Sequence, residues 1–117
     1  MSKAKLFHNP RCSKSRRAPQ LLGEHGADFE VVEYIKTPPD RATLLALIEA
    51  SDSPAGEFVR SGDAGFKEAG LHLSASADAR EVATLLADHP RLLQRPIFVA
   101  GAKAVIGRPP ERVLELL

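Results

Sequence analysis

The only cysteine of this chain, Cys12, stands where a short apolar segment is expected to turn into a helix. Four basic residues lie within five positions of it, namely Arg11, Lys14, Arg16 and Arg17. A thiol is a nucleophile only as its thiolate, and the unpaired N–H groups of a helix N-terminus, together with nearby cations, favour that anion. Most single cysteines fill a core as small hydrophobes, but a cluster of cations is a poor neighbour for a buried thiol. The pattern therefore indicates a reactive thiolate.

The spacing around Cys12 excludes several thiol chemistries. An anion loop of the phosphatase type needs an arginine six residues after the cysteine, where this chain has Ala18. A dithiol redox motif needs a second cysteine three residues on, and that residue is Ser15. Ser15 can donate a hydrogen bond to a thiolate but cannot resolve a disulfide. Any catalytic disulfide must therefore form with the thiol of a partner.

The histidines form no recognisable metal site with Cys12, because their spacing matches no ligand pattern. His8 lies four residues before Cys12, and it either tunes the thiol or has a structural role at the end of a strand. We expect His25, His72 and His89 at the surface or at helix ends. The sequence thus predicts no metal.

The composition is that of an ordinary soluble protein. The 117 residues are 44% hydrophobic and 26% charged, which predicts a single domain over residues 1–117. The net charge of +1 is too small to indicate nucleic acid or an anionic membrane surface as a partner. No apolar run has the length of a membrane span or of a secretion signal. Because one cysteine cannot form an internal disulfide, we expect the protein in the reducing cytoplasm.

The hydrophobic pattern divides the chain into strands and helices. Residues with high β-propensity predict strands over 5–8, 29–35, 96–100 and 103–106, the last two joined at Gly101. Helical spacing and stop signals predict helices over 13–25, 54–60, 64–69 and 77–88 and after 109–110. One more helix should follow Thr37 as its N-cap, with Pro38 in the first position.

The predicted order is strand, helix, strand, a helical block, then two strands and a helix. A nucleophilic cysteine after the first strand, and the Arg95-Pro96 pair before the third, are typical of thioredoxin-like proteins. We therefore expect an α/β fold with a thioredoxin-like mixed sheet. A helical insertion over about 38–93 should separate the second and third strands.

The sequence resembles the glutaredoxin-coupled arsenate reductase family over nearly its whole length. The resemblance rests on His8-Asn9-Pro10-x-Cys12-x-x-Ser15-Arg16, Tyr34 with Thr37-Pro38-Pro39, Arg60, His89-Pro90, Arg95-Pro96-Ile97 and Gly107-Arg108-Pro109. It implies that Cys12 attacks arsenate. It also implies that three arginines, Arg60, Arg95 and Arg108, hold the oxyanion and its reduced product. Planar guanidinium groups suit that task, since an arsenate has about the charge and oxygen geometry of a phosphate.

The resemblance implies the rest of the reaction as well. His8, Ser15 and Arg16 would support the thiolate, and Pro96 would be a cis-proline facing it. No cofactor would be bound. Glutathione would add to the cysteine–arsenic adduct as a co-substrate, and glutaredoxin, as the protein partner, would remove that glutathione as a disulfide while arsenite leaves.

Two other functions remain open at this point. A glutathione-dependent monothiol oxidoreductase would use the same fold and the same Cys-x-x-Ser, but would not need the three arginines together. A non-catalytic regulator of the Spx type, which binds RNA polymerase, would share the fold. Such regulators usually have a longer chain and often a Cys-x-x-Cys switch, and this chain has neither.

We predict that the pKa of Cys12 is depressed, because a helix N-terminus and clustered cations favour the thiolate. The rate of alkylation by iodoacetamide, measured against pH, should show an inflection clearly below that of free cysteine. An inflection at or above about 8.5, the value for a free thiol, would contradict a catalytic role.

Overall fold

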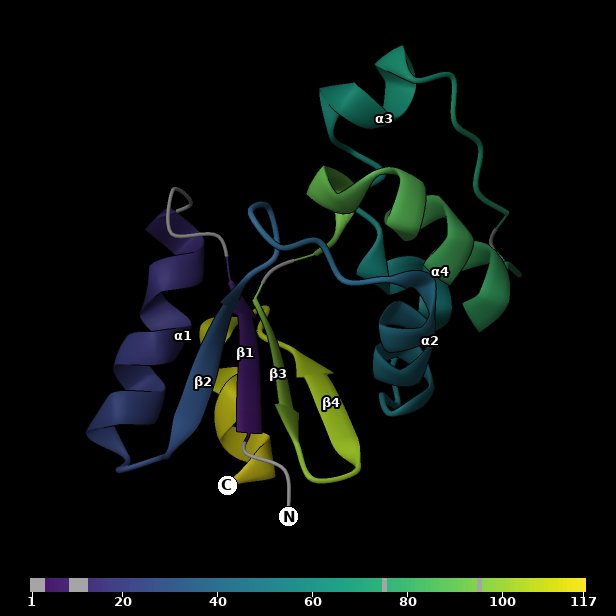
Figure 1. Ribbon diagram of the computed structural model, residues 1–117. Coiled ribbons are helices and arrows are strands. Elements are labelled where there is room, and N and C mark those ends of the chain that lie inside the picture. The colour runs from purple at the N-terminus through teal and green to yellow at the C-terminus, as the bar shows by residue number, and fades with distance from the viewer. Residues whose placement is uncertain (1–3, 9–12, 75, 95) are drawn as a thin grey trace.

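The computed structural model describes residues 4–8, 13–74, 76–94 and 96–117. Its centre is a four-stranded sheet in the order β2-β1-β3-β4 (Figure 1). The strands are β1 (Ala4–His8), β2 (Phe29–Glu33), β3 (Ile97–Ala100) and β4 (Lys103–Ile106). β1 is parallel to β2 and antiparallel to β3, and β4 is antiparallel to β3. The expected order of elements along the chain is confirmed.

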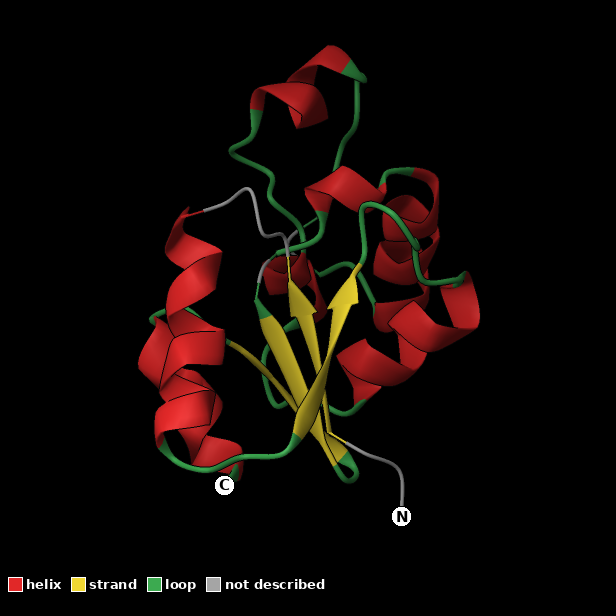
Figure 2. Ribbon diagram, turned by 60° about the vertical axis from the view of Figure 1, so that its left-hand side comes forward, coloured by secondary structure: helices red, strands yellow, loops and turns green. Residues whose placement is uncertain are grey.

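One face of the sheet is covered by the first and last helices. These are α1 (Ser13–Glu24) and the 3₁₀ helix η3 (Pro110–Leu116), which lie together on one side of the strands in Figure 2. Because side chains alternate along a strand, Leu6, Phe98 and Val105 all point to this face. They pack against Leu22 of α1 and Val113 of η3, and all five side chains are buried.

The other face packs against the helices between β2 and β3. These are α2 (Arg41–Glu49), η1 (Ala55–Phe58), α3 (Ala64–Glu68), α4 (Ala79–Asp88) and η2 (Pro90–Leu92). Phe7, Ile97 and Ile106 of the sheet belong to this second core. In Figure 1, α2 and α4 lie side by side and α3 stands farthest from the sheet. The helical block is thus joined to the strands by a core of its own.

The start of α2 differs from the prediction. The helix begins at Arg41, and its N-cap is Asp40 rather than Thr37, since a carboxylate oxygen of Asp40 accepts a hydrogen bond from Thr43 N at 2.8 Å. That hydrogen bond also lowers the pKa of Asp40. β2 ends at Glu33, two residues earlier than predicted, because the N–H groups of Lys36 and Thr37 turn back to the Glu33 carbonyl.

Two predicted helices are also shorter or tighter than expected. The segment predicted as a helix over 54–60 is helical only over Ala55–Phe58, because Val59 is extended and pairs with Leu93 as an antiparallel bridge. The last helix is 3₁₀ rather than α. Within the residues described here, none of the helices has both the length and the apolar character needed to cross a membrane.

Gly107 connects the end of β4 to the start of β3 through a backbone hydrogen bond. Its N–H donates a hydrogen bond to the carbonyl of Pro96 at 2.8 Å. A Cβ added at Gly107 would lie 2.8 Å from Pro96 Cγ and 3.0 Å from Val113 Cγ1. The proline ring is rigid and buried, so it cannot move aside. The close approach of these two segments therefore requires glycine.

We predict that Gly107→Ala destabilises the protein by about 1–3 kcal/mol, the usual cost of overpacking a core. Gly23→Ala is the matched control, because Gly23 lies within α1 and a Cβ there meets nothing within 4 Å. The control should raise stability by about 0.5–1 kcal/mol through the helix preference of alanine. Urea unfolding followed by circular dichroism measures both, and equal stability of the two variants would contradict the steric argument.

Candidate functional site

The ends of three strands and the start of a fourth meet at one edge of the sheet. Phe7 pairs with Ile97, and Ile97 pairs with Ile106, so these residues form a row across β1, β3 and β4. The chain leaves β1 after His8, enters β3 from Pro96 and leaves β4 into Gly107. We call this row and the residues beyond it the carboxyl edge of β1. It lies at the top of the sheet in Figure 1.

Cys12 and Arg95 themselves lie outside the described residues. Their neighbours along the chain place the segments that carry them. Cys12 comes four residues after His8 and directly before α1, which begins at Ser13 as predicted. Arg95 joins Gln94 to Pro96, and the ring of Pro96 is fully buried beside Gly107. Both segments therefore reach the carboxyl edge of β1.

The side chains next to the thiol position differ in their surroundings. His8 is only 6% exposed at the end of β1, which fits a structural role, and its action on the thiol stays a prediction. Arg16 is exposed on α1, while the side chain of Ser15 lies outside the described part. Arg17 pairs with Glu24 at 3.8 Å, so its guanidinium extends toward the C-terminal end of α1. Arg17 therefore adds less to the positive charge at Cys12 than its position in the sequence indicated.

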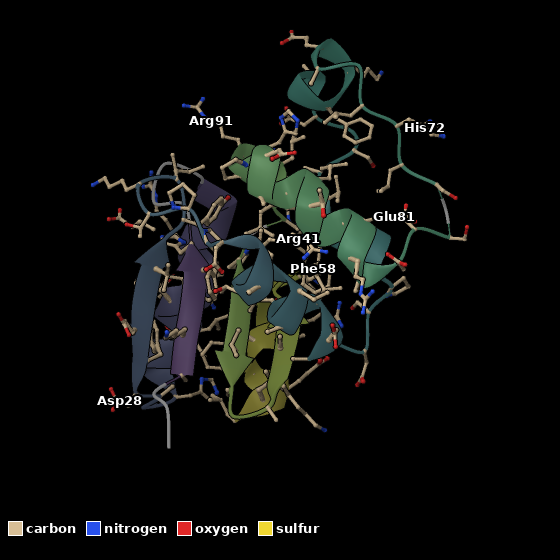
Figure 3. The ribbon with its side chains drawn as sticks, turned by 45° about the vertical axis from the view of Figure 1, so that its right-hand side comes forward. Asp28, Arg41, Phe58, His72, Glu81 and Arg91 are labelled. Atoms are coloured by element: carbon tan, nitrogen blue, oxygen red, sulfur yellow. The ribbon has the colours of Figure 1, made fainter. Side chains whose placement is uncertain are left out.

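Arg60 is brought to this region by a short antiparallel contact. Val59 pairs with Leu93, the N–H of Arg60 donates to Leu92 O at 2.7 Å, and the N–H of Gln94 donates to Phe58 O at 2.8 Å. Phe58 is fully buried and lies between α2 and α4 (Figure 3), so its segment is firmly anchored. The backbone of Arg60 thus runs beside the segment that leads through Arg95 into β3. The expectation that Arg60 ends a helix is wrong, because its N–H bonds across to another segment.

Arg108 follows β4 at the same edge. It is exposed, and its N–H donates to Ile106 O at 2.9 Å. The bond between Arg108 and Pro109 is cis. The cis bond expected before Pro96 involves Arg95 and therefore lies outside the described residues. The segment of Arg60 pairs with residues that precede β3, and Arg108 follows β4; the grouping of the arginine side chains stays a prediction.

The remaining histidines lie where the sequence indicated. His25 follows α1, with its ring nitrogen 3.0 Å from Leu21 O; His89 caps the end of α4; His72 is exposed in a loop (Figure 3). In the described ranges, no three side chains of His, Cys, Asp or Glu form a group that could hold a metal ion.

Two polar residues near the edge were missed by the sequence analysis. Asp63 Oδ2 lies 3.1 Å from Arg60 Nη1, and the spacing of three residues was the signal that could have indicated this pair. The amide oxygen of Gln94 is buried and has no hydrogen-bond partner in the part of the chain that the structure describes. Native proteins leave few buried polar atoms without a hydrogen-bond partner.

The segments that carry Arg60 and Arg108 reach the edge at which α1 also begins. A helix N-terminus attracts negative charge, and guanidinium groups bind anions through paired donors. The first turn of α1 contains no acidic residue to compete with a bound anion.

Known proteins are similar to this chain over nearly its whole length. A sequence model of the ArsC family matches residues 7–116. An arsenate reductase of Neisseria meningitidis is 43% identical and covers 100% of both chains. An uncharacterised protein of Escherichia coli, YfgD, is 45% identical over 97% of this chain and 95% of its own. Among solved structures, an arsenate reductase from Vibrio cholerae matches with a TM-score of 0.86 and 34% identity over 97% of each chain.

The match to these structures covers the sheet and the helices on both its faces, so the thioredoxin-like fold expected from the sequence is confirmed. The family model spans every segment that reaches the carboxyl edge of β1, from Phe7 to Leu116. The chain belongs to the ArsC family.

Proposed function

We propose that this protein is an arsenate reductase that uses glutathione and glutaredoxin as its reductants. The observation that carries the proposal is the meeting of four chain segments at the carboxyl edge of β1. These segments carry Cys12, Arg60, Arg95 and Arg108. The names of the relatives from Neisseria meningitidis and Vibrio cholerae support the choice of arsenate.

The three arginines would bind the oxyanion before the chemistry begins. Each guanidinium offers planar paired donors, which match two oxygens of arsenate better than an ammonium does. Arg60 would reach this role from the helical block, whereas Arg95 precedes β3 and Arg108 follows β4 in the sequence. Donors from separate segments can surround an anion, and they orient it toward the thiolate.

The reaction would begin when the Cys12 thiolate attacks arsenic and an oxygen of arsenate leaves as water after protonation. Glutathione then replaces a second oxygen on arsenic, which also leaves as water. The thiolate of glutaredoxin attacks the glutathione sulfur to form a mixed disulfide, and the electron pair of the broken S–As bond reduces As(V) to As(III). Water then hydrolyses the bond between Cys12 and As(III), so arsenite leaves and the thiolate of Cys12 is restored. Overall, arsenate and two thiols give arsenite, one disulfide and one water.

The absence of a second cysteine supports a reaction in which the reducing thiols come from outside the protein. Cys12 has no partner cysteine in the chain, so the disulfide must form between external thiols. Ser15, in the position of a resolving cysteine, can only donate a hydrogen bond to the thiolate. Thiol reductants are maintained in the cytoplasm, and we place the reaction there.

The proposal predicts arsenate-dependent oxidation of NADPH when the protein is coupled to glutathione, glutaredoxin and glutathione reductase. Cys12→Ser should abolish this turnover, because a serine hydroxyl cannot replace an ionised thiol as nucleophile. Ser15→Ala should keep part of it, since Ser15 only stabilises the thiolate. Wild-type turnover in Cys12→Ser would show that the mechanism is wrong.

Arg95 separates arsenate reduction from general glutathione chemistry. We expect Arg95→Lys to lose most arsenate turnover although the charge is kept, because lysine lacks the planar pair of donors. Reaction of Cys12 with a small neutral disulfide should change little, since it needs no oxyanion site. Arg80→Lys, at an exposed position of α4, is the control and should change neither activity.

Equal losses of both activities in Arg95→Lys would indicate a structural role for Arg95. Full retention of both would favour the monothiol oxidoreductase instead. Circular dichroism of each variant verifies that it is folded.

A further inference from the structure

The carboxylate of Asp63 makes two different contacts. One oxygen, Oδ1, accepts a hydrogen bond from Gly65 N at 2.8 Å and so caps the start of α3. The other, Oδ2, lies 3.1 Å from Nη1 of Arg60. The N–H of Asp63 also donates to Arg60 O at 3.0 Å, which closes the turn between the two residues. Asp63 is therefore held by α3 while it holds the guanidinium of Arg60.

The contact with Asp63 acts on a flexible side chain. The side chain of Arg60 is 26% exposed and that of Asp63 is 31% exposed, so the pair lies partly in solvent. An arginine side chain has large rotamer freedom, which must be lost before its donors can bind an anion. The contact with Asp63 removes part of this freedom in advance. It occupies donors on one side of the guanidinium and leaves others for a second acceptor.

The backbone of Arg60 is fixed independently. Its N–H bonds to Leu92 O at 2.7 Å, next to the Val59–Leu93 bridge. The bridge fixes the backbone from which the side chain extends, and the ion pair with Asp63 holds the guanidinium at its other end. Together they restrict the orientations open to Arg60.

We propose that Asp63 is a positioning residue, which orients Arg60 to bind the oxyanion. This inference rests on the proposed function, because it takes the ligand of Arg60 to be arsenate or a similar anion. A carboxylate near an anion site also repels the anion. If Asp63 mainly positions Arg60, removing its charge weakens anion binding. If it mainly repels the anion, removing its charge strengthens anion binding.

The test replaces the charge and keeps the cap. Asparagine is as good an N-cap as aspartate, so Asp63→Asn should leave α3 intact while the ion pair with Arg60 is lost. Asp78 is the matched control: it caps α4 through Glu81 N at 2.9 Å, and it pairs with no arginine among the residues described. We expect Asp63→Asn to raise the KM for arsenate about three- to tenfold, with kcat changed less than twofold and the melting temperature unchanged. Asp78→Asn should change none of these quantities.

A second measurement does not depend on turnover. Arsenate or inorganic phosphate bound at the arginines should protect Cys12 from iodoacetamide. The concentration that gives half protection should rise in Asp63→Asn by the same factor as KM. In an Arg60→Lys background, where the paired donors are already lost, Asp63→Asn should add little.

The outcomes separate the two proposals. Protection by the anion without arsenate turnover would refute the proposed function but leave the role of Asp63 testable by half protection. Unchanged or tighter anion binding in Asp63→Asn would overturn the positioning role. The same holds if the effect is equally large in the Arg60→Lys background, because Asp63 would then act without Arg60. A wild-type protein with neither turnover nor protection would overturn both.

Discussion

The antiparallel pairing of β3 with β1 is the contact on which the site depends. It places the start of β3 beside the end of β1, with Phe7 opposite Ile97. A parallel β3 would begin at the opposite edge of the sheet, and Arg95 would then be a full strand length from the segment of Cys12. β4 pairs with β3 in the same sense and returns the chain to the same edge at Gly107. Two strand pairings thus bring together the described neighbours of three of the four candidate residues.

The fourth candidate residue, Arg60, belongs to the helical block between β2 and β3. Its helices share a core with one face of the sheet, and the buried Phe58 anchors the segment just before Arg60. The bridge between Val59 and Leu93 then connects this anchored segment to the segment that leads into β3. Arg60 and Arg95 are thirty-five positions apart in the sequence, but their segments run side by side. Insertion of a helical block into a compact fold can therefore contribute to the site rather than merely lengthen a loop.

Ion pairs involve two of the arginines that the sequence places near the candidate site. Of the basic residues near Cys12 in the sequence, Arg17 pairs with Glu24 toward the far end of α1. Arg60 is paired with Asp63, which neutralises part of its charge. The position of a cation in the sequence therefore does not by itself tell how much charge it adds to an anion site.

The sequence by itself determined the order of strands and helices, the place of Cys12 before a helix and the family, because hydrophobic periodicity, stop residues and short motifs are local signals. It misplaced the start of α2, since Thr37 and Asp40 both have the chemistry of an N-cap; in the structure Thr37 belongs to the turn after Glu33 and Asp40 caps the helix. It also extended a helix through Val59, because the bridge to Leu93 is a contact between distant residues. The pairing of Arg60 with Asp63 and the close approach of Gly107 to Pro96 were decided only by the tertiary structure. Such contacts depend on packing between separate segments, and no pattern within one segment encodes them.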